Sequence, residues 1–430
     1  MKTRFLAALA ALASALSAHA LDFGASERIR LEIFDDIPYP VAEPAVARGG
    51  CNNYWRFRTL AWAEQALGDH ALLRVRACSE LRAWHKGTPA NEWPDELIFD
   101  LLQLDLRDIF ADGDRYVLGR QELGRLGVLF CDGTPLDGSR SGYVTGASGH
   151  TPLAGPWSAD AFAICDPEED DLAIGHEHRA LCGYGGAANP MGDAGAGLFL
   201  TFATNGFSLT PYAVWKHESA WTKTDGTRVA NEDIWTAGLR LKGACGPFSA
   251  DLDGAWQASP SSDADRRAAM ALANACFAPE DVFLSPFFAL HAVYFSGDDP
   301  DTKRNEAFNV LWGRGAWLSD LVIFAYDLDG AGNWRNLLYG AAEVGIRPAP
   351  GHSLSLSAGP MRAPEADSAT GGHDRGWLYQ AKWAAPVVHA KEGGRGAIDA
   401  AVLGEWLDPG DYYPSGETAY FLRFQLTLSY

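Results

Sequence analysis

The chain ends in a stretch where apolar and polar side chains alternate with a period of two. Its apolar face consists of Tyr420, Leu422, Phe424, Leu426, Leu428 and Tyr430. The opposite face is mostly polar and includes Arg423, Gln425 and Thr427. A period of two is that of a β-strand with two different faces. The stretch is as long as the ~10 residues that a tilted strand needs to cross a bilayer. It therefore predicts a membrane-spanning strand with one face on lipid and the other on a lumen.

The same alternation recurs along the chain, at 55–63, 71–83, 234–242, 248–257 and 398–406. One face of each stretch is apolar or small, and the other carries full charges, such as Arg74 and Arg76 on either side of Val75. In a soluble barrel those charges would lie in a packed core, at a prohibitive cost in free energy. A water-filled lumen removes that cost, so the pattern favours a membrane barrel.

The spacing of such stretches predicts an even number of strands, about 18. We expect them at 27–35, 53–66, 71–84, 96–107, 114–123, 138–147, 159–165, 197–204, 207–219, 232–243, 247–258, 266–277, 282–296, 336–348, 352–362, 377–386, 395–406 and 417–430. Short connections (67–70, 205–206, 243–246, 348–351) alternate with long ones (166–196, 297–335, 363–376). Short turns on one side and long loops on the other are typical of outer-membrane barrels. The predicted fold class is all-β: a transmembrane antiparallel β-barrel in an up-and-down meander.

Residues 1–20 have the layout of a secretory signal peptide. Lys2 and Arg4 precede an apolar run that ends near Leu16, and Ala18-His19-Ala20 provides a cleavage site. We expect this segment to be removed, leaving 21–430 as one barrel domain in the cell outer membrane. The formal net charge of −20 makes the chain a poor ligand for nucleic acid.

Several motifs, taken in order, resemble the alginate-export family of outer-membrane porins. They are 118–123 followed by 136–140, 160–164, 237–243 followed by 251–257, 295–300 followed by 306–311, 406–413 and 419–423. The resemblance implies an 18-stranded barrel that passes a polyuronate through an arginine-rich pore. Carried over by motif, it implies that Arg120, Asp137, Arg140 and Arg240 line the pore.

Alternation places more basic than acidic residues in the lumen, with the excess in the first three strands. Rings of arginine or lysine select anions, and the planar guanidinium group matches a carboxylate. We expect the path to be lined by Arg56, Arg58, Arg74, Arg76, Arg82, Arg120, Asp137, Arg140, Arg240 and Lys242. The alternative is that these arginines pair with the inward acids and simply brace the wall.

Other residue combinations give weaker signals. The cluster of His176, His178 and Cys182 has metal-binding residue types but lies in a Gly-rich polar stretch typical of a solvated loop. The acid spacing of 327–333 departs from that of a calcium loop. Seven cysteines leave at least one without a partner in the chain, and a bridge between Cys165 and Cys182 is one hypothesis. We expect no catalytic residue, metal or cofactor.

The sequence therefore predicts an outer-membrane channel, not an enzyme, that passes anionic saccharides such as an alginate-like polyuronate. One alternative is a general anion-preferring porin for small solutes. Another is a soluble, secreted, β-rich carbohydrate-active protein. The expected partners are an anionic polysaccharide or another anionic solute, outer-membrane lipid and periplasmic export proteins.

Overall fold

The computed structural model describes residues 21–35, 52–84, 96–130, 143–166, 173–175, 193–222, 228–260, 265–313, 318–321, 335–366, 370–389, 396–414 and 416–430. Several residues discussed above lie outside these ranges: the signal segment 1–20, Asp137, Arg140, His176, His178, Cys182 and 327–333. No helix in the described ranges is long and apolar enough to span a bilayer.

Eighteen long strands account for most of the described chain. They are β1 (Asp22–Asp35), β2 (Asn52–Ala66), β3 (Ala71–Trp84), β4 (Glu96–Arg107), β5 (Arg115–Glu122), β6 (Tyr143–Pro152), β7 (Trp157–Asp166), β9 (Asp193–Thr204), β10 (Phe207–Glu218), β13 (Glu232–Cys245), β14 (Phe248–Pro260), β15 (Asp265–Phe277), β16 (Pro286–Phe295), β17 (Leu337–Ile346), β18 (Ser353–Arg362), β19 (Asp374–Val388), β20 (Ala397–Asp408) and β21 (Ala419–Ser429). The shorter elements are β8 (Ala173–Gly175), β11 (Trp221–Thr222), β12 (Arg228–Val229), and the 3-10 turns η1 (Gly124–Leu126) and η2 (Val128–Phe130).

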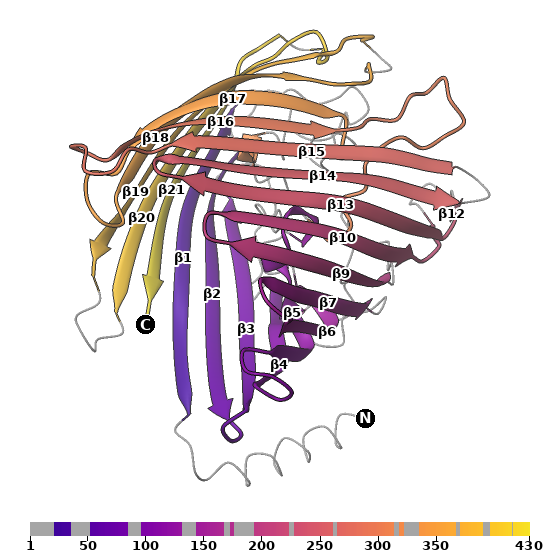
Figure 1. Ribbon diagram of the computed structural model, residues 1–430. Helices are drawn as coiled ribbons and strands as arrows, with labels where there is room; N and C mark the ends of the chain where they lie inside the picture. The colour runs from indigo at the N-terminus through magenta and orange to yellow at the C-terminus, as the bar shows by residue number, and fades with distance from the viewer. Residues whose placement is uncertain are drawn as a thin grey trace.

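Each long strand pairs antiparallel with the next, and the last pairs with the first. Ala25 and Tyr430 exchange two backbone hydrogen bonds, of 3.0 and 2.9 Å, at this seam. Figure 1 shows the resulting closed wall, in which β1 runs beside β21. The predicted up-and-down meander is therefore confirmed, because every expected strand overlaps one of the eighteen. β6 (Tyr143–Pro152) is shifted by five residues at both ends from the expected 138–147, and β1 begins five residues before the expected start at 27.

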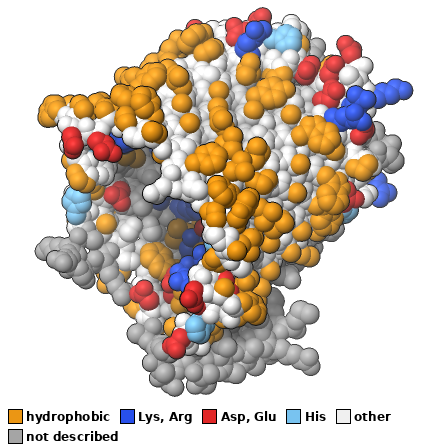
Figure 2. All heavy atoms as spheres, in the orientation of Figure 1, with side chains coloured by type: hydrophobic (Ala, Val, Ile, Leu, Met, Phe, Trp, Pro, Cys, Tyr) orange, Lys and Arg blue, Asp and Glu red, His pale blue; other side chains and the backbone are white. Residues whose placement is uncertain are grey.

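The alternation of side chains places apolar residues on the outside of this wall. Along β13, Trp235 and Leu239 are 57% and 43% exposed, whereas Ile234 and Thr236 are buried. Along β21, Phe424, Leu426 and Leu428 are exposed, and Arg423, directly before Phe424, is buried. Figure 2 shows many hydrophobic side chains spread over the outer wall. This face suits lipid, as the sequence predicts.

The short turns have the expected positions and clear chemical causes. Gly206 has a φ of +82° in the tight turn between β9 and β10, a conformation that glycine adopts without strain. Between β4 and β5, the carboxylate of Asp114 accepts hydrogen bonds from the backbone N–H groups of Ile109, Phe110 and Ala111. Burial alone would raise the pKa of Asp114, but these donors outweigh it and lower the pKa.

Parts of two connections, 123–130 and 305–313 together with 318–321, fold into the barrel, which the alternation pattern does not predict. The indole of Trp312 stacks on Phe130 with ring centroids 5.4 Å apart and meets the inward ring of Phe162 edge-on at 5.8 Å. Gln257 on β14 and Asn309 exchange two hydrogen bonds, of 2.8 and 2.9 Å. Lys216 on β10 donates a 2.7 Å bond to the Leu311 carbonyl. The lumen thus contains an apolar core of its own, and hydrogen bonds to polar side chains of the wall hold this core in place.

Among the cysteines that the structure describes, Cys165 has a free thiol on the outer face of β7. Its partner in the hypothetical bridge, Cys182, lies outside the described residues.

Candidate functional site in the lumen

Two strands, β1 and β2, carry arginines directly opposite one another on their inward faces, and the register adds an arginine position on β3. In the register of these strands, Arg28 faces Arg58, and Arg56 lies between Arg30 and Arg82. Like charges directly opposite each other on neighbouring strands destabilise a sheet. The arrangement therefore needs compensating groups nearby.

Two buried glutamates provide part of this compensation. Arg56, 1% exposed, forms a close ion pair with Glu80 and a longer one, of 3.9 Å, with Glu32. Arg28 approaches Glu80 at 3.4 Å, and Arg30 approaches Glu32 at 3.7 Å. Each carboxylate is therefore shared between arginines of different strands.

A further arginine, Arg423 on β21, joins the same group. It donates a 2.6 Å hydrogen bond to Glu32 and bonds of 2.6 and 2.8 Å to Asp320 of the inner segment. In these contacts four arginines share three carboxylates, so the group is net positive. We call this set the upper arginine cluster: Arg28, Arg30, Arg56, Arg423, Glu32, Glu80 and Asp320.

Two donor atoms of this cluster lack a hydrogen-bond partner in the described part of the chain: Nε of Arg28 and Nη1 of Arg30. Buried polar groups are normally hydrogen-bonded, so an unmet donor on an arginine needs an explanation. Oε2 of Glu32, in the same cluster, also lacks a hydrogen-bond partner among the described residues, so unmatched donors and an unmatched acceptor lie close together here.

Towards the end of the barrel that carries the short turns, the arginines are matched more evenly. Arg74 pairs with Glu64 at 3.1 Å, and both side chains are 31% exposed. Arg76 forms a bidentate pair with Asp100, at 2.7 Å at its shortest, and also contacts Glu122. Asp100 is fully buried, so replacing Arg76 would leave an uncompensated charge. Arg76 is therefore a brace as well as a lumen residue.

The remaining expected residues lie on other parts of the wall. Arg120 is buried, donates a 2.9 Å bond to the Phe99 carbonyl and lies over the Tyr143 ring. Arg240 pairs with Asp253 at 2.9 Å and donates another 2.9 Å bond to the Leu126 carbonyl of the inner segment.

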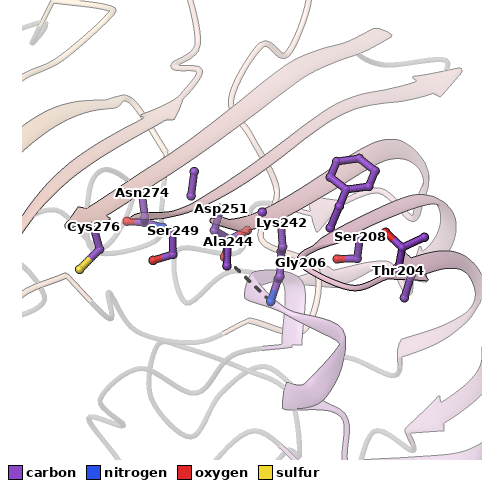
Figure 3. Close-up of a pocket in the computed structure, with 13 residues that line it drawn as sticks. Thr204, Gly206, Ser208, Lys242, Ala244, Ser249, Asp251, Asn274 and Cys276 are labelled. Atoms are coloured by element: carbon purple, nitrogen blue, oxygen red, sulfur yellow. Dashed lines mark ion pairs between the residues drawn. The ribbon is translucent and has the colours of Figure 1, made fainter. Parts of the chain in front are cut away.

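Lys242 lies apart from the upper arginine cluster, beside an open cavity of about 410 Å³. The cavity is bordered by the β9–β10 turn and by β13, β14 and β15. Figure 3 shows Lys242 and Asp251 reaching towards each other there, 4.0 Å apart. An exposed pair of this kind contributes little to stability, and one base against one acid gives no net charge.

The structure thus brings Arg56 and Arg58 together on one wall, with position 82 opposite Arg56 in the register and Arg74 and Arg76 further along. Arg120 lies on β5, and Arg240 and Lys242 lie on β13. Arg28, Arg30 and Arg423 also belong to the wall with Arg56 and Arg58, although they are not among the expected path residues. Asp320 was missed altogether, because it comes from a long connection with no periodic signal.

No cluster of three or more potential metal ligands occurs within the described ranges. Figure 2 shows a hollow in the barrel with Lys and Arg side chains inside it.

Comparisons with known proteins show the fold. No family model and no curated protein matches the sequence. The outer-membrane protein OprD from Pseudomonas aeruginosa superposes with a TM-score of 0.56 at 12% identity, over 97% of this chain and 96% of OprD. Pseudomonas aeruginosa OpdO gives 0.55 at 12% identity, over 95% and 96% of the two chains. OccK2 (OpdF) from the same organism, solved in complex with glucuronate, gives 0.55 at 10% identity, over 95% and 96%. The fold is that of outer-membrane porins, which fits an outer-membrane location. The resemblance to the alginate-export family finds support only at this level.

Proposed function

We propose that the chain is an outer-membrane channel that passes anionic saccharides, alginate-like polyuronates among them, along the inner face of β1–β3. One observation carries the proposal: arginines lie directly opposite one another across β1 and β2, and in the contacts of the described residues four arginines share three carboxylates. Acids do lie opposite bases in this wall, since Arg58 faces Glu80 and Arg423 faces Glu32, so part of the arginine charge is braced. The proposal rests on the arginines left over in the described contacts. Their excess charge favours an anion in the lumen.

The class of solute rests on chemistry and on one structural neighbour. A guanidinium group matches a carboxylate in shape and charge. The neighbour OccK2 was solved with a uronate, glucuronate. Both are consistent with an acidic sugar, and the fold argues for a channel and against an enzyme or a soluble carbohydrate-active protein. A cleaved signal segment at 1–20 and a barrel domain at 21–430 remain part of the proposal.

A general anion-preferring porin is the second candidate. The moderate exposure of Arg28 and Arg74 favours it, because small anions could reach these groups without any fit to a sugar. The two candidates share an anion path and differ only in whether the wall recognises a saccharide.

Reversal potentials in planar bilayers under a salt gradient test the anion path. Replacing Arg28 and Arg58 together with Gln should lower the anion preference, because both face the lumen at the same level. Glu80 keeps Arg56 as a partner in this variant, so the barrel should still fold. Lys242→Gln is the matched control, since Lys242 lies by Asp251 outside the cluster. Unchanged reversal potentials in the double variant, or an equal shift in the control, would refute the proposed path.

A further inference from the structure

One large aromatic side chain, Trp62, lies on the same inner face as the arginines. In the register it is placed between Gly24 on β1 and Arg76 on β3. A Cβ atom at position 24 would overlap the indole ring, so Trp62 covers the backbone of Gly24 closely. The side chain of Trp62 is nevertheless only partly buried. Part of the ring thus rests on the backbone of β1, and the side chain as a whole keeps some exposed surface.

Basic groups lie on both sides of Trp62 along the wall. Arg58 is four residues before it on β2, about 13 Å away along the strand. Arg74 lies opposite Glu64, two residues beyond Trp62. Leu60, between Arg58 and Trp62 on the inward face, adds a second apolar surface. The wall therefore presents arginine, an apolar patch and arginine in sequence.

A purely structural role explains only part of this arrangement. An aromatic ring that covers a glycine on a neighbouring strand supports that strand, as designed sheets also show. That role uses part of the ring and does not require the side chain to keep exposed surface. The aromatic girdles of membrane barrels face lipid, whereas Trp62 faces inward, so anchoring in the bilayer does not account for it.

We propose that Trp62 is a stacking platform for the sugar rings of an acidic saccharide whose carboxylates contact the flanking arginines. The faces of a pyranose ring carry C–H groups and pack well on an indole, while the carboxylates need guanidinium partners. A simple aliphatic carboxylate has the charge but lacks the ring face. Trp62 therefore distinguishes the saccharide channel from the general anion porin. This inference deepens the proposed function and rests on it.

Single-channel current block tests the platform with two probes: a galacturonate trisaccharide, and tricarballylate, an acyclic tricarboxylate of the same charge. In Trp62→Ala, the Kd of the trisaccharide should rise about three- to tenfold, the range of one lost aromatic contact. The Kd of tricarballylate should stay unchanged. Trp62→Phe should keep most of the affinity for the trisaccharide. Trp55→Ala is the matched control, because Trp55 is on the same strand but faces lipid.

The outcomes separate the platform from the channel. An equal rise for both probes in Trp62→Ala, or no rise for either, overturns the platform while the anion path stands. A wild-type channel that binds neither probe overturns the proposed function itself. If Trp62→Ala does not insert into the membrane, Trp62→Leu keeps apolar bulk over Gly24 and removes only the aromatic face. The same selective loss is expected of it, and retained trisaccharide affinity in Trp62→Leu counts against the platform.

Discussion

At the scale of single residues, Arg56 should tolerate substitution poorly, because its buried side chain lies between Glu32 and Glu80 and pairs with both. Arg56→Met removes the cation and leaves these buried carboxylates without their shared partner. Breaking a buried ion pair in this way costs about 3–5 kcal/mol. We expect a loss of this size in the free energy of unfolding, measured by denaturant titration in lipid vesicles. Arg74→Gln, at a partly exposed pair, should cost less than about 1 kcal/mol.

The sequence predicts on which face these arginines lie but not their partners. Facing follows from alternation within one strand, so it can be read locally at Arg28, Arg56 and Arg423. Pairing depends on the register between strands and on residues far away in the chain. Asp320 reaches Arg423 from a connection 103 residues earlier, which no local pattern indicates. The partners that brace each arginine are therefore visible only in the structure.

At the scale of the element, β21 offers a test of facing with adjacent residues. Leu426→Arg would place a charge on the lipid face, 44% exposed in the wild type, at a cost of about 2–4 kcal/mol near the bilayer midplane. Gln425→Glu, one residue away, also introduces a full charge, but it points into the lumen opposite Arg30, whose guanidinium already bonds Gln425, and should be tolerated. Folding yields into lipid vesicles compare the two variants. Equal yields would mean that β21 faces the other way.

The turn before β5 should make the stability of the folded protein depend on pH. The ionised carboxylate of Asp114 holds three backbone N–H groups, and its pKa is lowered by them. A lowered pKa stabilises the folded state above the ordinary value of 3.8, and this stabilisation is lost as the pH falls towards the lowered value. Asp114→Ala should therefore be less stable than the wild type at neutral pH. The gap in unfolding free energy should narrow below about pH 4 and stay constant from pH 6 to 8.

The predicted strand bounds are accurate where the two faces of a strand differ in polarity, and they are shifted along the chain where the faces are alike. β13 and β14 alternate large apolar with charged residues, and their expected ranges are within a few residues of the observed ones. β6 contains Gly146, Ser148 and Gly149, which give no contrast between its faces. Its expected range was consequently five residues too early.

At the scale of the whole molecule, the inner segments narrow the barrel from within. Replacing Trp312 and Phe130 with Ala removes a stacked pair from the apolar core of the lumen. We expect a larger single-channel conductance, together with a loss of about 3–5 kcal/mol in stability for each large aromatic removed. Trp256→Ala, on the lipid face, is the control and should leave the conductance unchanged. A double variant with wild-type conductance would show that these segments do not limit the pore.

The inward course of these segments could have been suspected from their composition. The stretch Leu123–Phe130 and the stretch Ala307–Trp312 are apolar, although they lie in connections that a barrel would normally expose to water. Apolar residues in a connection need a surface to bury against, and the wall of a wide lumen supplies one. The sequence indicates that need, but it does not show which wall residues meet the segments.

The contacts of Arg423 also bear on the order in which the barrel assembles. This one side chain, on the last strand, touches Glu32 on the first strand and Asp320 on an inner segment. Until β21 docks on β1, neither carboxylate has this partner. Closing the circumference and seating the inner segment therefore depend on the same guanidinium group. A chain in which β21 has not yet paired with β1 therefore lacks both the contact with Glu32 and the contact with Asp320. The width of the finished lumen thus depends on the last strand pairing to form.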